Sequence, residues 1–238
     1  FVRFPSMPTI SITSLLSIVF LLPASLVAQE PYKVEDLKQG PPSSIAPEIT
    51  KALNPQGFRI KDSGGKTFAD IWLRKSIPAA SKPSGAKETI QFPFLQQSEL
   101  LGVVQLAVEG HDYRDQAIPK GIYTVRYGLQ PVNGDHLGVS PFRDYILMLP
   151  AAKDKTLEIL PRKELETSSA EAAGSTHPAI LFMLAVPSSS SPTKATMIHD
   201  QEKNTWRLVV PLSLSVKGES RLVEFPVSIV VVGASEAA

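Results

Sequence analysis

The chain of 238 residues contains no cysteine, and this absence limits how its fold can be stabilised. Disulfides and thiolate metal sites are both excluded, so the folded chain depends on an ordinary hydrophobic core. Aromatic residues are scarce, at 7% of the chain, whereas there are 21 prolines. This composition indicates many short strands and loops rather than long helices.

The common catalytic signatures are also missing. No serine lies in Gly-x-Ser-x-Gly, and there is no cysteine nucleophile, no His-Glu-x-x-His and no phosphate-binding glycine loop. Residues 63–66 (Ser-Gly-Gly-Lys) lack the leading glycine and the following helix of such a loop, and instead predict a hairpin turn. We therefore expect no cofactor and no metal, and the sequence names no reaction.

The N-terminal part contains a short apolar run at residues 15–22. A Pro-Ala-Ser break follows, and small Ala28 precedes polar Gln29, which is the layout of a secretory signal with a cleavage site. The run is shorter than the roughly 20 residues of a membrane span. We expect residues 1–28 to be a signal peptide, with a retained membrane anchor as the alternative. The mature protein would then be periplasmic or extracellular, with no membrane span.

Charges of the two signs are balanced. Arg3 is the only charged residue of the predicted signal, so its removal leaves 23 basic and 23 acidic side chains. A net charge of zero gives no basis for attraction to nucleic acid or to an anionic membrane surface. The partners that we expect are a glycan or another protein of the cell envelope.

Apolar residues at every second position predict a mainly β domain over residues 57–238, preceded by a loosely packed N-terminal arm at 29–56. In residues 122–129, Tyr123, Val125 and Tyr127 share one face, and Thr124 and Arg126 share the other. This alternation is typical of a strand with one buried face.

The remaining elements follow the same pattern. We predict strands at 100–108, 143–149, 179–186, 205–216 and 221–232. A helix is predicted at 162–173, and a short one at 45–53 within the N-terminal arm. Pro211 and Pro226 lie within the last two strands and favour edges or bulges there, because proline cannot donate to the ladder. About eight to ten strands with a short helical insertion predict an antiparallel β-sandwich.

Potentially chemical side chains gather around strands 122–129 and 143–149. The candidate ligand-binding residues are Asp135, His136, Arg143 and Asp144, in or beside the 130–144 loop. His111 precedes the first of these strands, and a seven-residue strand spans roughly 23 Å, so a joint metal site of His111 and His136 is disfavoured. Residues 133–135 (Asn-Gly-Asp) are also explained by turn chemistry alone.

Residues 118–151 resemble a group of uncharacterised secreted bacterial proteins that share a Lys-Gly-x-Tyr-Thr-x-Arg-Tyr-Gly-Leu-Gln-Pro core. In this chain the core runs from Lys120 to Pro131, and residues 174–180 are similar as well. The resemblance implies an exported domain of unknown function and transfers no catalytic residue.

These observations favour a non-enzymatic, exported β-sandwich that serves as a binding or structural module of the cell envelope. One alternative is a metal-assisted hydrolase or metal-binding protein that uses the 130–144 loop. Another is a subunit of a larger envelope assembly that docks through residues 179–186 or the C-terminal strands.

Overall fold

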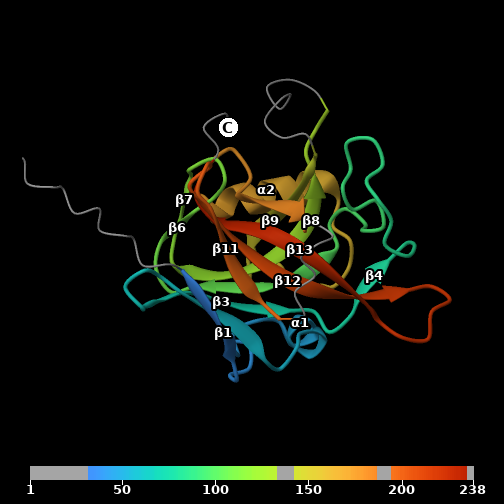
Figure 1. The fold of residues 1–238 in the computed structure, drawn as a ribbon, viewed down its shortest axis with the longest axis horizontal. Helices are drawn as coiled ribbons and strands as arrows, with labels where there is room; N and C mark the ends of the chain where they lie inside the picture. The colour runs from blue at the N-terminus through green and yellow to red at the C-terminus, as the bar shows by residue number, and fades with distance from the viewer. Residues whose placement is uncertain (1–31, 133–141, 187–193, 235–238) are drawn as a thin grey trace, which may run out of the picture.

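The computed structural model describes residues 32–132, 142–186 and 194–234 (Figure 1). These residues form thirteen strands and two short helices. The strands are β1 (Lys33–Leu37), β2 (Gly57–Lys61), β3 (Thr67–Leu73), β4 (Ile77–Ala79), β5 (Leu100–Leu106), β6 (Gly110–His111), β7 (Ala117–Ile118), β8 (Gly121–Leu129), β9 (Asp144–Pro150), β10 (Ile180–Ala185), β11 (Thr196–Asp200), β12 (Thr205–Val216) and β13 (Val223–Val232). The helices are α1 (Pro47–Ala52) and α2 (Arg162–Ala172).

Eleven of the described strands join in one sheet, with the order β1-β2-β3-β5-β8-β9-β10-β13-β12-β11 and β4 added beside β12. Neighbouring strands are antiparallel except for β4, which pairs with β12 in parallel. The sheet is therefore mixed. The remaining two strands, β6 and β7, form a small hairpin.

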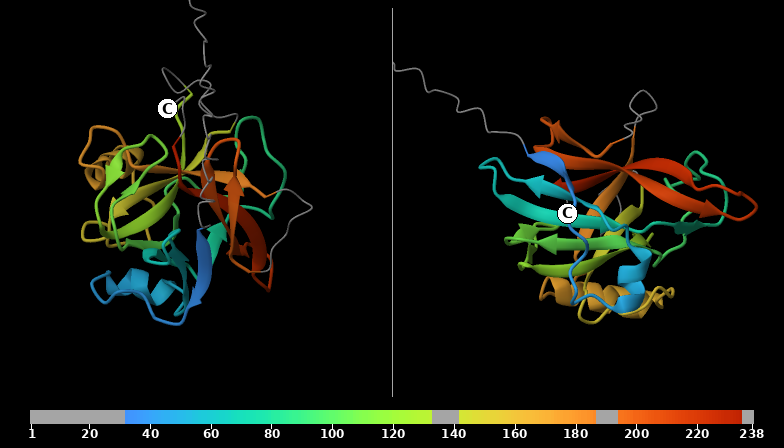
Figure 2. Two further views of the ribbon diagram at one scale, coloured as in Figure 1. Left: turned by 60° about the vertical axis from the view of Figure 1, so that its left-hand side comes forward. Right: turned by 90° about the horizontal axis from the view of Figure 1, so that it is seen from below.

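The sheet curls on itself because β10 changes partners along its length. Its first half, Ile180–Phe182, pairs with β9, and its second half, Met183–Ala185, pairs with β13. Strands that pass from one part of a sheet to another in this way produce its corners. As a result the two end strands of the order, β1 and β11, approach each other (Figure 2).

The prediction of a mainly β chain with a short helical insertion is confirmed, but a two-sheet antiparallel sandwich is not. The reason is that β10 pairs with both β9 and β13, so the two layers are joined by hydrogen bonds into one continuous sheet. Side chains from both walls still fill one interior, and these form the main hydrophobic core.

The prediction that β8 buries one face only is wrong. Tyr123, Val125 and Tyr127 face the main core, as expected. Thr124 and Arg126 on the opposite face are fully buried too. A loop that follows β9 covers this second face and supplies its partners.

The segment before the domain does not pack loosely where the structure describes it. β1 pairs with β2 along all five of its residues. Helix α1 places Ile49 against a second cluster of apolar side chains that includes Leu53, Trp72 and Leu100. Residues 33–53 thus add a strand and a helix to the same folded unit.

The helix expected at 162–173 is present as α2 and ends before Gly174, which has a positive φ of 58°. Leu165 buries its side chain against Tyr145, Leu147 and Leu149, so α2 covers the outer face of β9. Within the described residues, neither helix has the length and apolar character to cross a bilayer.

Candidate functional site

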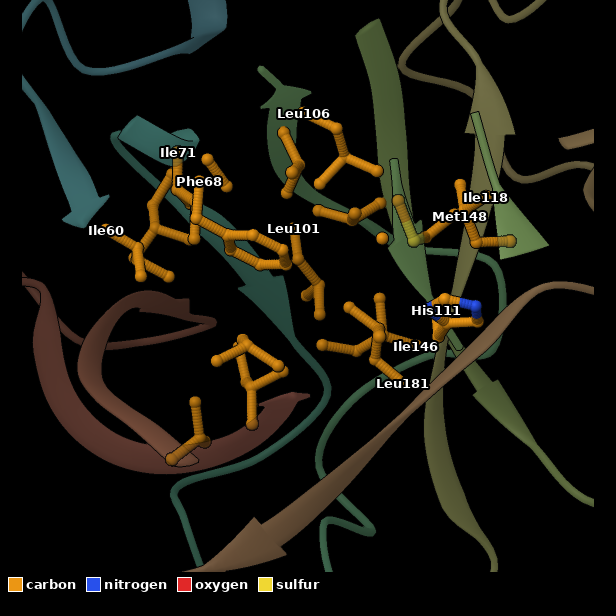
Figure 3. Close-up of a pocket in the computed structure, with 18 of the residues that line it drawn as sticks. Ile60, Phe68, Ile71, Leu101, Leu106, His111, Ile118, Ile146, Met148 and Leu181 are labelled. Atoms are coloured by element: carbon orange, nitrogen blue, oxygen red, sulfur yellow. The ribbon is translucent and has the colours of Figure 1, made fainter. Parts of the chain in front are cut away.

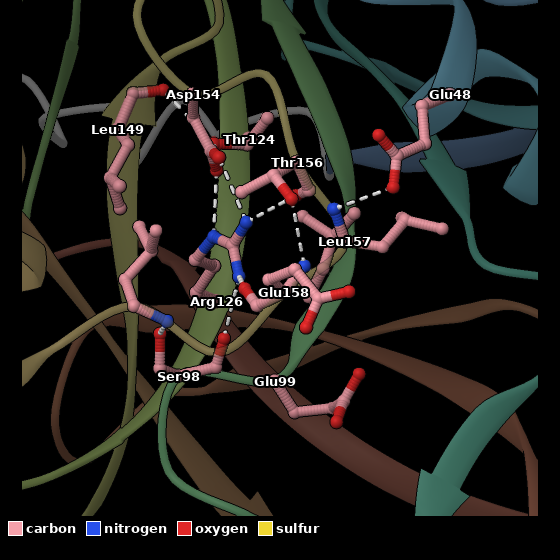
Figure 4. Close-up of polar contacts among 12 residues, drawn as sticks. Glu48, Ser98, Glu99, Thr124, Arg126, Leu149, Asp154, Thr156, Leu157 and Glu158 are labelled. Atoms are coloured by element: carbon pink, nitrogen blue, oxygen red, sulfur yellow. Dashed lines mark hydrogen bonds and ion pairs between the residues drawn. The ribbon is translucent and has the colours of Figure 1, made fainter.

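The Lys120–Pro131 motif centres on Arg126, which is fully buried and has a partner for every N–H group (Figure 4). Its Nε and Nη2 donate to the two carboxylate oxygens of Asp154 at 2.7 and 2.8 Å. Its remaining N–H groups donate to backbone carbonyls, those of Ser98, Thr156 and Glu158. No donor is left over for a ligand.

Thr124 completes this arrangement by donating its hydroxyl to the Asp154 carboxylate at 2.6 Å. A buried ion pair stabilises a fold only when its remaining hydrogen-bonding capacity is met, and here it is. The polar residues of the motif therefore attach the loop at 154–158 to the sheet. Their role is architectural.

A second buried pair lies close by and is less well satisfied. Arg74 Nη1 donates to the carboxylate of Glu99 and to the carbonyl of Leu100, while Arg74 Nε has no partner within the described residues. Burial raises the pKa of Glu99, and the nearby guanidinium of Arg74 opposes this rise.

Asp144, one of the candidate ligand-binding residues, is a fully buried structural carboxylate. It accepts hydrogen bonds from the Tyr127 hydroxyl at 2.6 Å and from the backbone N–H groups of Gln91 and Phe92 at 2.6 and 3.0 Å. Burial raises the pKa of Asp144, and these hydrogen bonds partly offset the rise. Coordinating a metal would require exchanging them.

Arg143 holds the start of the same strand. Its Nε donates to the carbonyl of Gln130 at 2.6 Å, and its own N–H donates to the carbonyl of Thr89. The other two candidates, Asp135 and His136, lie outside the described residues.

The histidines that the structure describes are dispersed. His111 lies on β6, near the Gly121 end of β8, whereas Leu129 at the other end of β8 pairs with Asp144. His199 stacks on Trp206, with ring centroids 4.3 Å apart. Among the described residues, no group of three or more His, Asp or Glu side chains is arranged to hold a metal ion.

The feature best suited to hold a ligand is an apolar cavity of about 40 Å³ inside the curled sheet (Figure 3). One wall comes from β2, β3, β5, β8 and β9, and the other from β12 and β13. Val125 of β8, Ile146 and Met148 of β9 and Ile229 of β13 are among the lining residues. Every lining side chain except that of His111 is a hydrocarbon or, in Met148, a thioether.

The β6–β7 hairpin lies at one end of this cavity, and the buried Asp112 holds the hairpin in place. The buried Asp112 carboxylate accepts hydrogen bonds from the N–H groups of Arg114 and Gln116 within the hairpin loop. It also accepts one from the N–H of Ile180, at the start of β10. Tyr113 adds a second attachment to β10, because its N–H donates to the Ile180 carbonyl.

Comparison of the chain with protein-family models, with curated proteins and with solved structures finds no match.

Sequence reasoning did not identify the cavity. Its lining comes from ten separate strands, none of which carries a sequence pattern of its own that indicates a cavity. The local sequence signal is the pair Gly110-His111, in which a glycine precedes a polar side chain shortly before strand β8.

Proposed function

We propose that the protein is a non-enzymatic, exported binding module that takes a short alkyl group into the interior of its curled sheet. It would act in the periplasm or elsewhere in the cell envelope. In this proposal the two walls that meet at β10 serve as the layers of a β-sandwich. The observation that carries the proposal is the apolar cavity between them.

Its chemistry argues for hydrocarbon rather than water. A cavity needs only about 10–15 Å³ to admit a water molecule, but that water also needs two to four polar partners. The walls provide hydrocarbon side chains, and only His111 at one end is polar. An alkyl group placed here gains van der Waals contacts that the empty cavity forgoes.

The polar residues of β8 support the same proposal from the opposite side. The Arg126 guanidinium donates all of its N–H groups to the Asp154 carboxylate and to three backbone carbonyls. The Asp154 carboxylate also accepts a hydrogen bond from the Thr124 hydroxyl. Asp144 is used in the same way. A binding function therefore rests on the apolar interior rather than on the charged residues of the motif.

The other partners expected from the sequence receive less support. Trp72 and Trp206 are both buried, so neither offers a platform for a sugar ring. Each half of β10 already pairs with a strand of this chain, Ile180–Phe182 with β9 and Met183–Ala185 with β13. The metal-dependent alternative used Asp135, His136 and Asp144. The Asp144 carboxylate already accepts three hydrogen bonds, and the other two side chains lie outside the described residues.

Affinity for so small a ligand is bounded by its size. The best small ligands gain at most about 1.5 kcal/mol per non-hydrogen atom, so a five-atom ligand binds no more tightly than a dissociation constant of a few µM. Binding is best measured by a method suited to weak ligands.

Methyl NMR of protein labelled at the methionine methyl groups provides such a test. Met148 lines the cavity, whereas Met197 on β11 does not and serves as an internal reference. Titration with n-butane should shift the Met148 signal saturably and leave Met197 unchanged. Equal, non-saturating shifts of both signals would refute the proposal.

A variant of Gly110 tests whether the Met148 methyl shift reports binding in the cavity. Gly110→Ala adds a methyl group that meets Leu106 and Phe68 at 3.5 Å, an ordinary contact distance, at the end of the cavity. It should weaken n-butane binding. Gly85→Ala adds its methyl group to open space and is the matched control, with unchanged binding.

A further inference from the structure

The cavity reaches the surface at one end. Among its lining residues only His111 is exposed, and Phe68 and Leu181 are partly buried, whereas Val125, Ile146 and Met148 are buried. Figure 3 shows the His111 imidazole on the same side as Ile118 and Leu181, away from Ile60. A ligand in the cavity therefore has an apolar inner end and an outer end beside an imidazole.

The volume restricts the shape of that ligand. At about 10–15 Å³ for each water-sized group, the 40 Å³ cavity holds a chain of about three or four such groups. It has roughly a quarter of the ~150 Å³ apolar cavity that is known to accommodate benzene. A six-membered ring is therefore too large unless the walls separate, whereas a narrow three- or four-carbon chain fits.

The imidazole adds a polar requirement at the outer end. A histidine side chain has one N–H that donates when neutral and two when charged, so in either form it can donate to an oxygen. The backbone beside it is fixed, because His111 pairs with Ala117 and Asp112 attaches the hairpin to β10. An imidazole donor carried by this fixed backbone at the rim of an apolar cavity favours ligands that have an acceptor at their outer end.

We infer that the ligand is a short straight-chain molecule with an oxygen head group, an alcohol or a carboxylic acid of three or four carbons. The alkyl chain occupies the cavity, and the head group accepts a hydrogen bond from His111. This inference rests on the proposed function, because it requires that the interior takes an alkyl group at all.

The test compares small ligands of similar size that differ in head group. Dissociation constants for n-butane, 1-propanol and propanoate are measured from the Met148 methyl shift, with cyclohexane as the oversized probe. One neutral hydrogen bond corresponds to roughly a three- to tenfold change in affinity. We expect 1-propanol or propanoate to bind more tightly than n-butane by about this factor, and cyclohexane not to bind.

Two histidine variants assign the effect. His111→Ala should remove the advantage of the oxygen-bearing ligands and leave n-butane binding within about twofold of wild type. His177→Ala, at an exposed histidine outside the cavity, is the matched control and should retain the advantage.

The outcomes separate the two proposals. If n-butane binds but the head group gives no advantage, or an advantage that survives in His111→Ala, the inference about the ligand is wrong and the proposed function stands. If none of the probes shifts Met148 saturably, both are wrong. If the advantage is present in wild type and lost in His111→Ala, the relative affinities for 1-propanol and propanoate identify the head group.

Discussion

The two faces of strand β8 are both buried, but they are filled in opposite ways. On the outer face, Arg126 and Thr124 meet Asp154 in a polar layer in which each donor has an acceptor. On the inner face, Val125 borders an apolar cavity that is not completely filled. The outer face therefore has its hydrogen bonds satisfied, whereas the inner face borders unfilled apolar volume.

The difference shows where a conspicuous sequence motif can mislead. Charged and aromatic residues at regular spacing suggest chemistry, yet here they meet each other's requirements and attach loops to the sheet. In the proposed function, a ligand binds instead on the inner face of β8, where Val125 borders the apolar cavity. Experiments on both faces test this contrast.

The largest effect is expected at the polar face. Asp154→Ala leaves the buried Arg126 guanidinium without its carboxylate, and an unpaired buried charge costs about 3–5 kcal/mol of unfolding free energy. Chemical denaturation measures the loss. Glu171→Ala breaks the exposed pair with Lys153 and, as the control, should change stability by less than about 0.5 kcal/mol.

A double variant sharpens this prediction. Arg126→Met combined with Asp154→Leu removes both charges, and it should be more stable than Asp154→Ala alone. Recovery should be partial, because the carbonyls of Ser98 and Glu158 lose their donor. If the double variant is less stable than Asp154→Ala, the cost does not arise from the unpaired charge.

A smaller effect is expected from Tyr127→Phe. It removes the hydroxyl that donates to Asp144 but leaves the two backbone donors, so about 1–3 kcal/mol should be lost. Tyr113→Phe is the matched control. Among the described residues its hydroxyl has no hydrogen-bond partner, and its ring contact with Phe182 is retained. Equal losses in the two variants would contradict a specific role for the Tyr127–Asp144 hydrogen bond.

At the apolar face, Gly110→Ala should stabilise the protein by about 1 kcal/mol. The added methyl group is buried in available space, and the unfolded chain loses conformational freedom. Gly85→Ala provides only the second contribution and should stabilise less. Thermal or chemical unfolding of both variants measures the difference, and a destabilised Gly110→Ala would indicate that no space exists there.

The smallest effect should appear as a dependence on pH. Because burial raises the pKa of Glu99 in the folded protein above its ordinary value of 4.5, the folded state keeps this proton to higher pH than the unfolded state. The favourable contribution of Glu99 is thus complete below pH 4.5 and is lost as pH rises through the raised pKa.

Glu99→Gln keeps the shape of the side chain but does not titrate. Across that range, the stability of wild type minus that of Glu99→Gln should therefore fall as pH rises. Denaturation at a series of pH values measures this difference. A constant or rising difference would contradict a raised pKa at Glu99.

Local patterns in the sequence predicted much of the fold. Strand β12 has the predicted limits, and β13 begins two residues later than expected. Pro211 and Pro226 face each other, and each lies beside a gap in the ladder on its other side, as a residue without an N–H requires. Alternation and turn residues are local properties, so they can be read without knowledge of distant contacts.

The candidate site was predictable only in part, since its contacts are distant in sequence. Arg126 was placed on a solvent-facing side because its partner, Asp154, lies 28 residues away in a loop with no recognisable pattern. Asp144 was treated as a ligand-binding residue for a similar reason, since its donors at Gln91 and Phe92 are more than 50 residues away. The cavity depends on how two walls fit together, which no single segment specifies.

The most direct measurement is diffraction from a crystal held under xenon, which enters apolar cavities and avoids polar ones. We predict a xenon peak inside the curled sheet, in contact with Val125 and Met148, and none on the outer face of β8 beside Arg126. Absence of xenon from the interior, or equal occupancy beside Arg126, would contradict the assignment of binding capacity to the apolar face.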